Sequence, residues 1–207
     1  TNADLPEKPK KKRKYKKVKT MKRPPRGESI EKRPAEVDTR ETFGHWEGDT
    51  VYSKKDGSKA LFVLTERLTR EEIMVRIKDR TAESVIKALD RIERKCGPVL
   101  FRKIFRTITV DNGGEFSDVE RLERSALRKT LKRTKVYFCH PYSSYERGSN
   151  ECQNKMIRRP FPKGTDFGNV TDAEVARAEQ WMNNYPRKIL GWKTSEMLFR
   201  EYAAALI

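Results

Sequence analysis

Three acidic side chains stand where a carboxylate needs a partner. Asp49 lies inside the apolar stretch 43–51, and Asp111 directly follows the apolar stretch 105–110. Glu151 lies near the start of a later predicted helix. Burying an unpaired carboxylate is costly, so each needs a cation, a metal ion or an opening to solvent. Three carboxylates suit Mg²⁺ or Mn²⁺, and two such ions about 3.5–4 Å apart support phosphodiester chemistry.

Each of these residues also has an ordinary interpretation. Asp111 begins an Asp-Asn-Gly-Gly sequence that is common in turns. Glu151 alone is typical of a carboxylate that faces a helix N-terminus. Glu146 competes for the third position, and Glu47 and Glu115 are further candidates. Glu47 shares a strand face with Asp49, so it either supports the site or faces solvent.

Three segments contain these carboxylates: WEGD at 46–49, TVDNGGEF at 109–116 and HPYSSYERGSNE at 140–151. Together they resemble the catalytic core of DDE transposases from bacterial insertion sequences. The closest subgroup is the IS-thirty family, whose core is similar to retroviral integrase. Further similarity at 157–167 and 186–193 extends the match over about residues 28–200.

The resemblance implies an α/β fold of the ribonuclease-H-like (integrase core) type, with a mixed five-stranded sheet flanked by helices. It implies that Asp49, Asp111 and Glu151 bind the catalytic Mg²⁺ or Mn²⁺, two ions in all. Glu151 is preferred over Glu146 because the family's Gly-x-x-Glu pattern aligns with Gly148 and Glu151.

The resemblance also implies DNA cleavage and strand transfer at the ends of a mobile element. The partners would be double-stranded DNA, both transposon ends and target, and further copies of the chain assembled on it. The place would be the bacterial cytoplasm, at the nucleoid. Two alternatives remain: a non-catalytic DNA-binding remnant, and a ribonuclease-H-type nuclease acting on RNA–DNA hybrids.

The sequence departs from the family pattern at several positions. Between Asp111 and Glu151 lie 39 residues, a few more than the mid-thirties that are usual. Tyr145 replaces a usual Trp, Pro160 a frequent aromatic residue and Tyr185 a frequent Arg. The fold expectation is unaffected by these differences.

The charge of the chain favours a polyanionic partner. Lys and Arg number 47 against 30 Asp and Glu, a net charge of +17. Residues 1–27 alone hold 12 Lys or Arg and two acidic residues. We predict a flexible DNA-facing arm over residues 1–40 and a catalytic core over 41–207. The phosphate contacts would come from Lys10, Lys11, Lys12, Arg13 and Lys14. A plain linker and a nuclear localisation signal are the alternatives.

Cationic side chains also accompany Glu151 on its predicted helix. Glu151, Lys155 and Arg158 share one helix face, with Asn154 at its edge. We predict that Asn154, Lys155 and Arg158 contact DNA; the alternative is a surface salt bridge of little energetic value. His140 either assists near the metal or caps a turn, and we favour the turn.

Periodicity predicts the elements that must position these residues. A hairpin turn at Asp56-Gly57 joins the first two strands, and Thr81 caps the first helix, which ends at Gly97-Pro98. If the first and fourth strands are neighbours, Asp49 and Asp111 lie side by side. The predicted strands are 43–51, 59–67, 72–77, 105–110 and 136–139. Besides the helix that begins at 81, four helices are predicted, over 116–130, 149–159, 172–184 and 195–205.

Composition excludes several classes of protein. The longest apolar runs are far shorter than the roughly 20 residues that a membrane-spanning helix needs. Nine Phe, seven Tyr and three Trp argue against a disordered chain, and we expect Trp46 and Trp192 in the core. Three cysteines without CxxC spacing argue against a zinc site or a disulfide framework. We expect Cys139 and Cys152 to pack as small apolar groups.

Overall fold

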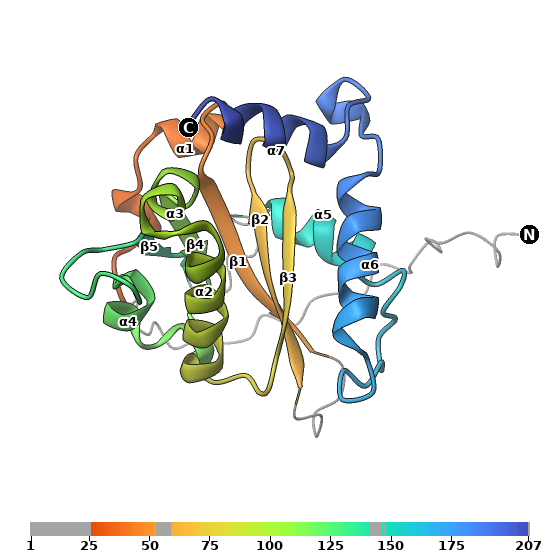
Figure 1. The fold of residues 1–207 in the computed structure, drawn as a ribbon, viewed down its shortest axis with the longest axis horizontal. Coiled ribbons are helices and arrows are strands. Elements are labelled where there is room, and N and C mark those ends of the chain that lie inside the picture. Colours follow the sequence, from red (N-terminus) through yellow and green to blue (C-terminus); the bar gives the residue numbers. More distant parts are fainter. Residues whose placement is uncertain (1–25, 53–58, 141–145, 147, 207) are drawn as a thin grey trace, which may run out of the picture.

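A five-stranded sheet with helices on both faces organises the protein (Figure 1). The computed structural model describes residues 26–52, 59–140, 146 and 148–206, and for Glu151 the backbone alone. The strands are β1 (His45–Val51), β2 (Ala60–Glu66), β3 (Glu72–Ile77), β4 (Thr107–Val110) and β5 (Lys135–Phe138). The α-helices are α1 (Glu36–Thr39), α2 (Ala82–Cys96), α3 (Pro98–Ile104), α4 (Val119–Glu123), α5 (Gly148–Ile157), α6 (Asp172–Asn183) and α7 (Ser195–Ala204).

The sheet is mixed and runs in the order β3-β2-β1-β4-β5. The strands β1, β2 and β3 pair antiparallel, whereas β4 runs parallel to both β1 and β5. Gly48 allows β1 and β4 to approach closely, because a Cβ there would lie 3.1 Å from Val110 Cγ1. The predicted adjacency of the first and fourth strands is confirmed.

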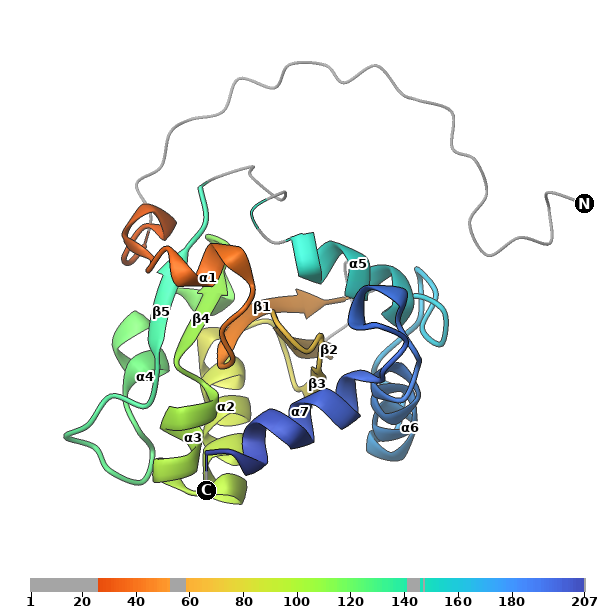
Figure 2. The ribbon, with the colours of Figure 1, turned by 90° about the horizontal axis from the view of Figure 1, so that it is seen from above.

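Two apolar clusters lie on opposite faces of the sheet. One joins α2, α3 and α4 to the sheet and includes Trp46, Phe62 and Phe101. The other joins α5 and α6 to the sheet and includes Leu61 and Ile157. Figure 2 shows α5 and α2 on opposite sides of β1. Because both faces are covered, every residue of β2 is buried, as expected for an apolar central strand.

Most predicted elements are confirmed within a few residues. Thr81 caps α2 by accepting a hydrogen bond from the Ser84 N–H, and Gly97 ends the helix with a φ of +78°. The short helix α3, which begins directly at Pro98, was not predicted. The predicted hairpin turn at Asp56-Gly57 lies outside the described residues.

The predicted helix over 116–130 is wrong. A 3-10 turn, η2 (Gly114–Phe116), precedes α4, which ends at Glu123. Ser125 breaks the helix because its hydroxyl accepts the N–H groups of Leu127 and Arg128 and donates to buried Glu93. Side-chain to backbone bonds of this kind compete with helical ones.

The folded region begins before the predicted boundary at residue 41. The Phe138 N–H donates to the Glu28 carbonyl at 2.8 Å, so this segment extends the sheet beside β5. Arg33 is buried and donates to Thr109 Oγ1 at 3.0 Å, and Val37 is buried as well. The predicted phosphate-binding run 10–14 lies outside the described residues.

Of the four side chains predicted to pack in the interior, two are buried and two are exposed. Trp46 is buried as predicted, and its indole donates to the Ile104 carbonyl at 2.8 Å. Trp192 is 69% exposed, so its core assignment is wrong; it follows Gly191 in a tight turn with a φ of +66°. Cys139 is buried, but Cys152 is exposed, contrary to prediction. In the described part of the chain, no helix has the length and apolar character needed to cross a membrane.

Buried His45 provides a test of the packing between β1 and β4. Its Nδ1 lies 2.8 Å from Thr107 Oγ1, and burial, aided by nearby Arg106, lowers the pKa of His45 from 6.5 to about 4. Between these values the unfolded chain binds the extra proton, so stability falls as the pH drops from 6.5 to 4. We expect His45→Asn to remove roughly 3 kcal/mol of this pH dependence, measured by urea unfolding at several pH values. Equal pH dependence in both proteins would contradict the assignment.

Candidate active site

The parallel pairing of β1 and β4 brings two of the predicted site residues together. Glu47 pairs with Thr109, and continuing this register by two residues places Asp111 opposite Asp49. Asp49 lies near the carboxyl end of β1, and Asp111 directly follows the carboxyl end of β4. Two acidic side chains therefore share one end of two neighbouring strands.

The turn after β4 fixes Asp111. Its Oδ1 accepts a hydrogen bond from the Gly113 N–H at 2.8 Å, and Asn112 Nδ2 donates to the Cys139 carbonyl at 2.6 Å. A Cβ on Gly113 would lie 2.8 Å from Asp111 Oδ1 and 2.5 Å from Glu115 Oε2. A side chain at position 113 would therefore displace one or both of these carboxylates, which approach the same point. The turn interpretation of Asp-Asn-Gly-Gly holds, and the turn itself orients the carboxylate.

Asp49 is tied to α5. Its Oδ1 accepts from the Thr50 N–H at 2.9 Å, and its Oδ2 accepts from Asn154 Nδ2 at 2.9 Å. Asn154 thus lies against one of the predicted site carboxylates. Its Oδ1 is buried and has no hydrogen-bond partner within the described residues.

The first turn of α5 is anchored on the sheet through Glu47. The Asn150 N–H donates to Glu47 Oε2 at 3.0 Å, and Thr65 Oγ1 donates to Asn150 Oδ1 at 2.9 Å. Glu47 is fully buried and pairs with Arg67, which is 3% exposed. Of the two alternatives for Glu47, the structure excludes the solvent-facing one, because the side chain is buried against the start of α5.

Glu151 occupies a position between these two anchors. It follows Asn150 directly and precedes Asn154 by three residues, so its backbone lies in the part of α5 that is attached to β1. Residues three apart are neighbours on a helix. Its rival Glu146 has another role: both its oxygens bind His140, at the backbone N–H and at Nδ1. This contact raises the pKa of His140 and agrees with a turn-capping histidine.

Comparison with known proteins identifies the family. Residues 39–144, which include Asp49 and Asp111, match the family model of the integrase core domain. The chain belongs to this family. Its core is 35% identical over 174 residues to a probable transposase for insertion-like sequence element IS1161 from Streptococcus salivarius, covering 84% of this chain and 46% of that protein. It is 34% identical over 179 residues to the transposase InsI for insertion sequence element IS30A from Escherichia coli K12, covering 86% and 43%.

The chain spans about half the length of the curated relatives it matches. A cryo-EM structure of the simian T-cell lymphotropic virus intasome, bound to a PP2A regulatory subunit, matches with a TM-score of 0.57 and 19% identity, covering 75% of this chain and 53% of that one. The predicted ribonuclease-H-like α/β fold is confirmed.

Cationic side chains flank the acidic end of this integrase core. Arg158 Nη2 donates to the Tyr52 carbonyl just beyond β1 at 2.8 Å, and burial lowers the pKa of Arg158. Arg80 lies 4.0 Å over the Tyr52 ring and keeps 40% of its side-chain surface exposed. Lys155 is exposed on α5. Arg80 was missed from the sequence because it belongs to no motif and reaches the site through its contacts in space.

The donor chemistry of the site fits a divalent cation. Asp49 and Asp111 supply hard oxygen ligands at one end of the sheet. The buried side-chain amide oxygens of Asn112 and Asn154 have no hydrogen-bond partner within the described residues. No group of three or more His, Cys, Asp or Glu side chains forms a metal site in the described ranges, which do not include the side chain of Glu151.

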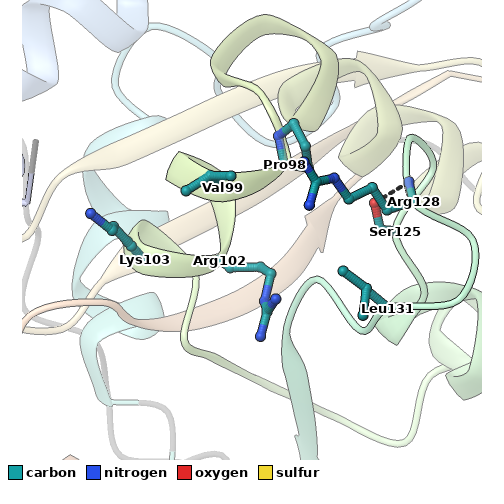
Figure 3. Close-up of a pocket in the computed structure, with 7 residues that line it drawn as sticks. All are labelled: Pro98, Val99, Arg102, Lys103, Ser125, Arg128 and Leu131. Carbon is teal, nitrogen blue, oxygen red and sulfur yellow. Dashed lines mark hydrogen bonds between the residues drawn. The ribbon is translucent and has the colours of Figure 1, made fainter.

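A separate pocket lies on the α2–α4 side of the integrase core (Figure 3). Its volume is about 300 Å³, and it contains none of the site carboxylates. The lining residues are Pro98, Val99, Arg102 and Lys103 on α3, together with Ser125, Arg128 and Leu131. This pocket is therefore distinct from the acidic end of β1 and β4.

Proposed function

We propose that this chain is the catalytic region of an insertion-sequence transposase, which cleaves and transfers DNA strands at the ends of a mobile element in a metal-dependent reaction. The observation that carries the proposal is the parallel pairing of β1 with β4, whose register places Asp49 and Asp111 at the same end of the two strands. The relationship to transposases over most of this chain supports it.

Residues of this chain would bind the metal ions and orient the side chains that bind them. Asp49 and Asp111 would hold the divalent metal ions, with Glu151 of α5 as the third ligand. Asn154 orients Asp49 through its hydrogen bond, and Glu47 fixes the helix that carries Glu151. Bound Mg²⁺ or Mn²⁺, two ions in all, would activate the attacking oxygen and stabilise the leaving oxygen of the phosphodiester.

The flanking cations would hold the DNA backbone. Arg80 and Arg158 lie beside Tyr52 at the acidic end of β1, and Lys155 follows on α5. The run Lys10, Lys11, Lys12, Arg13 and Lys14 would add phosphate contacts that carry no sequence information. We place the protein at the DNA of the bacterial nucleoid, where several copies would assemble on paired transposon ends.

The test is strand cleavage by the purified chain. A labelled terminal-repeat duplex is incubated with Mg²⁺ at low salt, beside a matched RNA–DNA hybrid and an EDTA control. We expect metal-dependent nicks in the duplex. Duplex binding without nicking would instead establish a DNA-binding remnant, and cleavage confined to the hybrid would establish a ribonuclease-H-type nuclease.

A further inference from the structure

A buried carboxylate outside the proposed set of metal ligands lies beside the Asp111 turn. Glu115, in η2, is 4% exposed. Its Oε1 accepts hydrogen bonds from Thr50 Oγ1 and from Arg80 Nη2, both at 2.6 Å. Although burial alone would raise the pKa of Glu115, these two hydrogen bonds lower it, so the carboxylate is ionised at neutral pH.

Thr50 connects Glu115 to the strand that carries Asp49. Successive side chains of a strand point to opposite faces of the sheet. Asp49 contacts Asn154 on the α5 face, whereas Thr50 contacts Glu115 on the other face. Glu115 is therefore linked to Asp49 through Thr50, from the face of the sheet opposite to α5.

The other oxygen of Glu115 reaches the Asp111 turn. Its Oε2 and Asp111 Oδ1 both come within 2.8 Å of the position that a Cβ on Gly113 would occupy. Arg80 neutralises Glu115 and lies close enough to Asp111 for their charges to interact. This half-buried ion pair thus contacts Thr50, the neighbour of Asp49, and lies beside the Asp111 turn.

We infer that Glu115 is a positioning residue that fixes the spacing between Asp49 and Asp111, through Thr50 on β1 and Arg80 beside the turn. The inference deepens the proposed function and rests on it. Residues that orient metal ligands in this indirect way typically change metal affinity or activity 10–100-fold when they are replaced.

The test compares Glu115→Gln with a matched variant. Glu123→Gln is the control, because Glu123 is also 4% exposed and ion-paired, to Lys132 at 2.6 Å, but lies on α4. Mn²⁺ binding is measured by the electron paramagnetic resonance of free Mn²⁺, and hydrogen exchange is followed over residues 111–117. Thr50→Val, which keeps the shape of the side chain, replaces Glu115→Gln if that variant does not fold.

We expect Glu115→Gln to weaken Mn²⁺ binding at least 10-fold and to speed exchange over 111–117, whereas Glu123→Gln changes neither. High Mn²⁺ should restore nicking by Glu115→Gln, because the ligands themselves remain. Unchanged Mn²⁺ affinity in Glu115→Gln, with tight binding by the wild type, would overturn the positioning role alone. Absence of Mn²⁺ binding by the wild type itself would overturn the proposed function together with this inference.

Discussion

Asp111→Asn should lower the rate of metal-dependent nicking at least about 1,000-fold while DNA binding is retained. Asparagine has the same size and still accepts the Gly113 N–H, so the turn should keep its shape. It lacks the negative charge that holds a divalent cation, and metal-based stabilisation of a phosphoryl transition state is worth several kcal/mol, or about three powers of ten in rate. Single-turnover cleavage of a labelled duplex measures the loss.

Asp118→Asn is the matched control for this experiment. Asp118 lies seven residues further along the chain and caps α4 by accepting the Arg121 N–H at 3.1 Å, a role that asparagine fills equally well. Its nicking rate should remain within about twofold of the wild type. If Asp111→Asn nicks as fast as this control, the assignment of Asp111 fails.

Glu47→Ala should lower the free energy of unfolding by about 3–5 kcal/mol. The substitution leaves the guanidinium of Arg67, which is 3% exposed, without its buried partner. It also removes the acceptor of the Asn150 N–H, so the start of α5 loses its anchor on β1. Urea unfolding followed by circular dichroism gives the free energy.

An exposed pair supplies the comparison for Glu47. Glu120 lies 3.8 Å from Arg124 and is 86% exposed, so Glu120→Ala should cost less than about 1 kcal/mol. Equal losses in Glu47→Ala and Glu120→Ala would show that the buried pair does not hold α5 in place.

The sequence predicts those parts of the fold that depend on local pattern. Alternation gives β3, and a cap at Thr81 gives the start of α2. The helix expected over 116–130 fails because Ser125 is bonded to Glu93, which lies far away in sequence. The exposure of Trp192 likewise depends on a turn with positive φ that hydrophobicity does not reveal.

In the candidate site, too, the features that depend on local pattern were predicted and those that depend on long-range contacts were not. Adjacent first and fourth strands were enough to predict that Asp49 and Asp111 lie at the same end of the sheet, because each residue stands near the carboxyl end of its own apolar stretch. The role of Glu115 depends on Thr50 and Arg80, which are 65 and 35 residues away along the chain. Contacts of such long range leave no periodic signal in the sequence.

We propose that three carboxylates, Asp49, Asp111 and Glu151, act together in metal-dependent DNA cleavage. The most direct test of this claim measures single-turnover nicking of a terminal-repeat duplex in Mg²⁺ by the wild type, Glu151→Gln and Glu146→Gln. We predict that Glu151→Gln abolishes nicking, whereas Glu146→Gln, which only loses contacts to His140, retains it. Nicking by the wild type in EDTA, or full activity of Glu151→Gln, would contradict the claim.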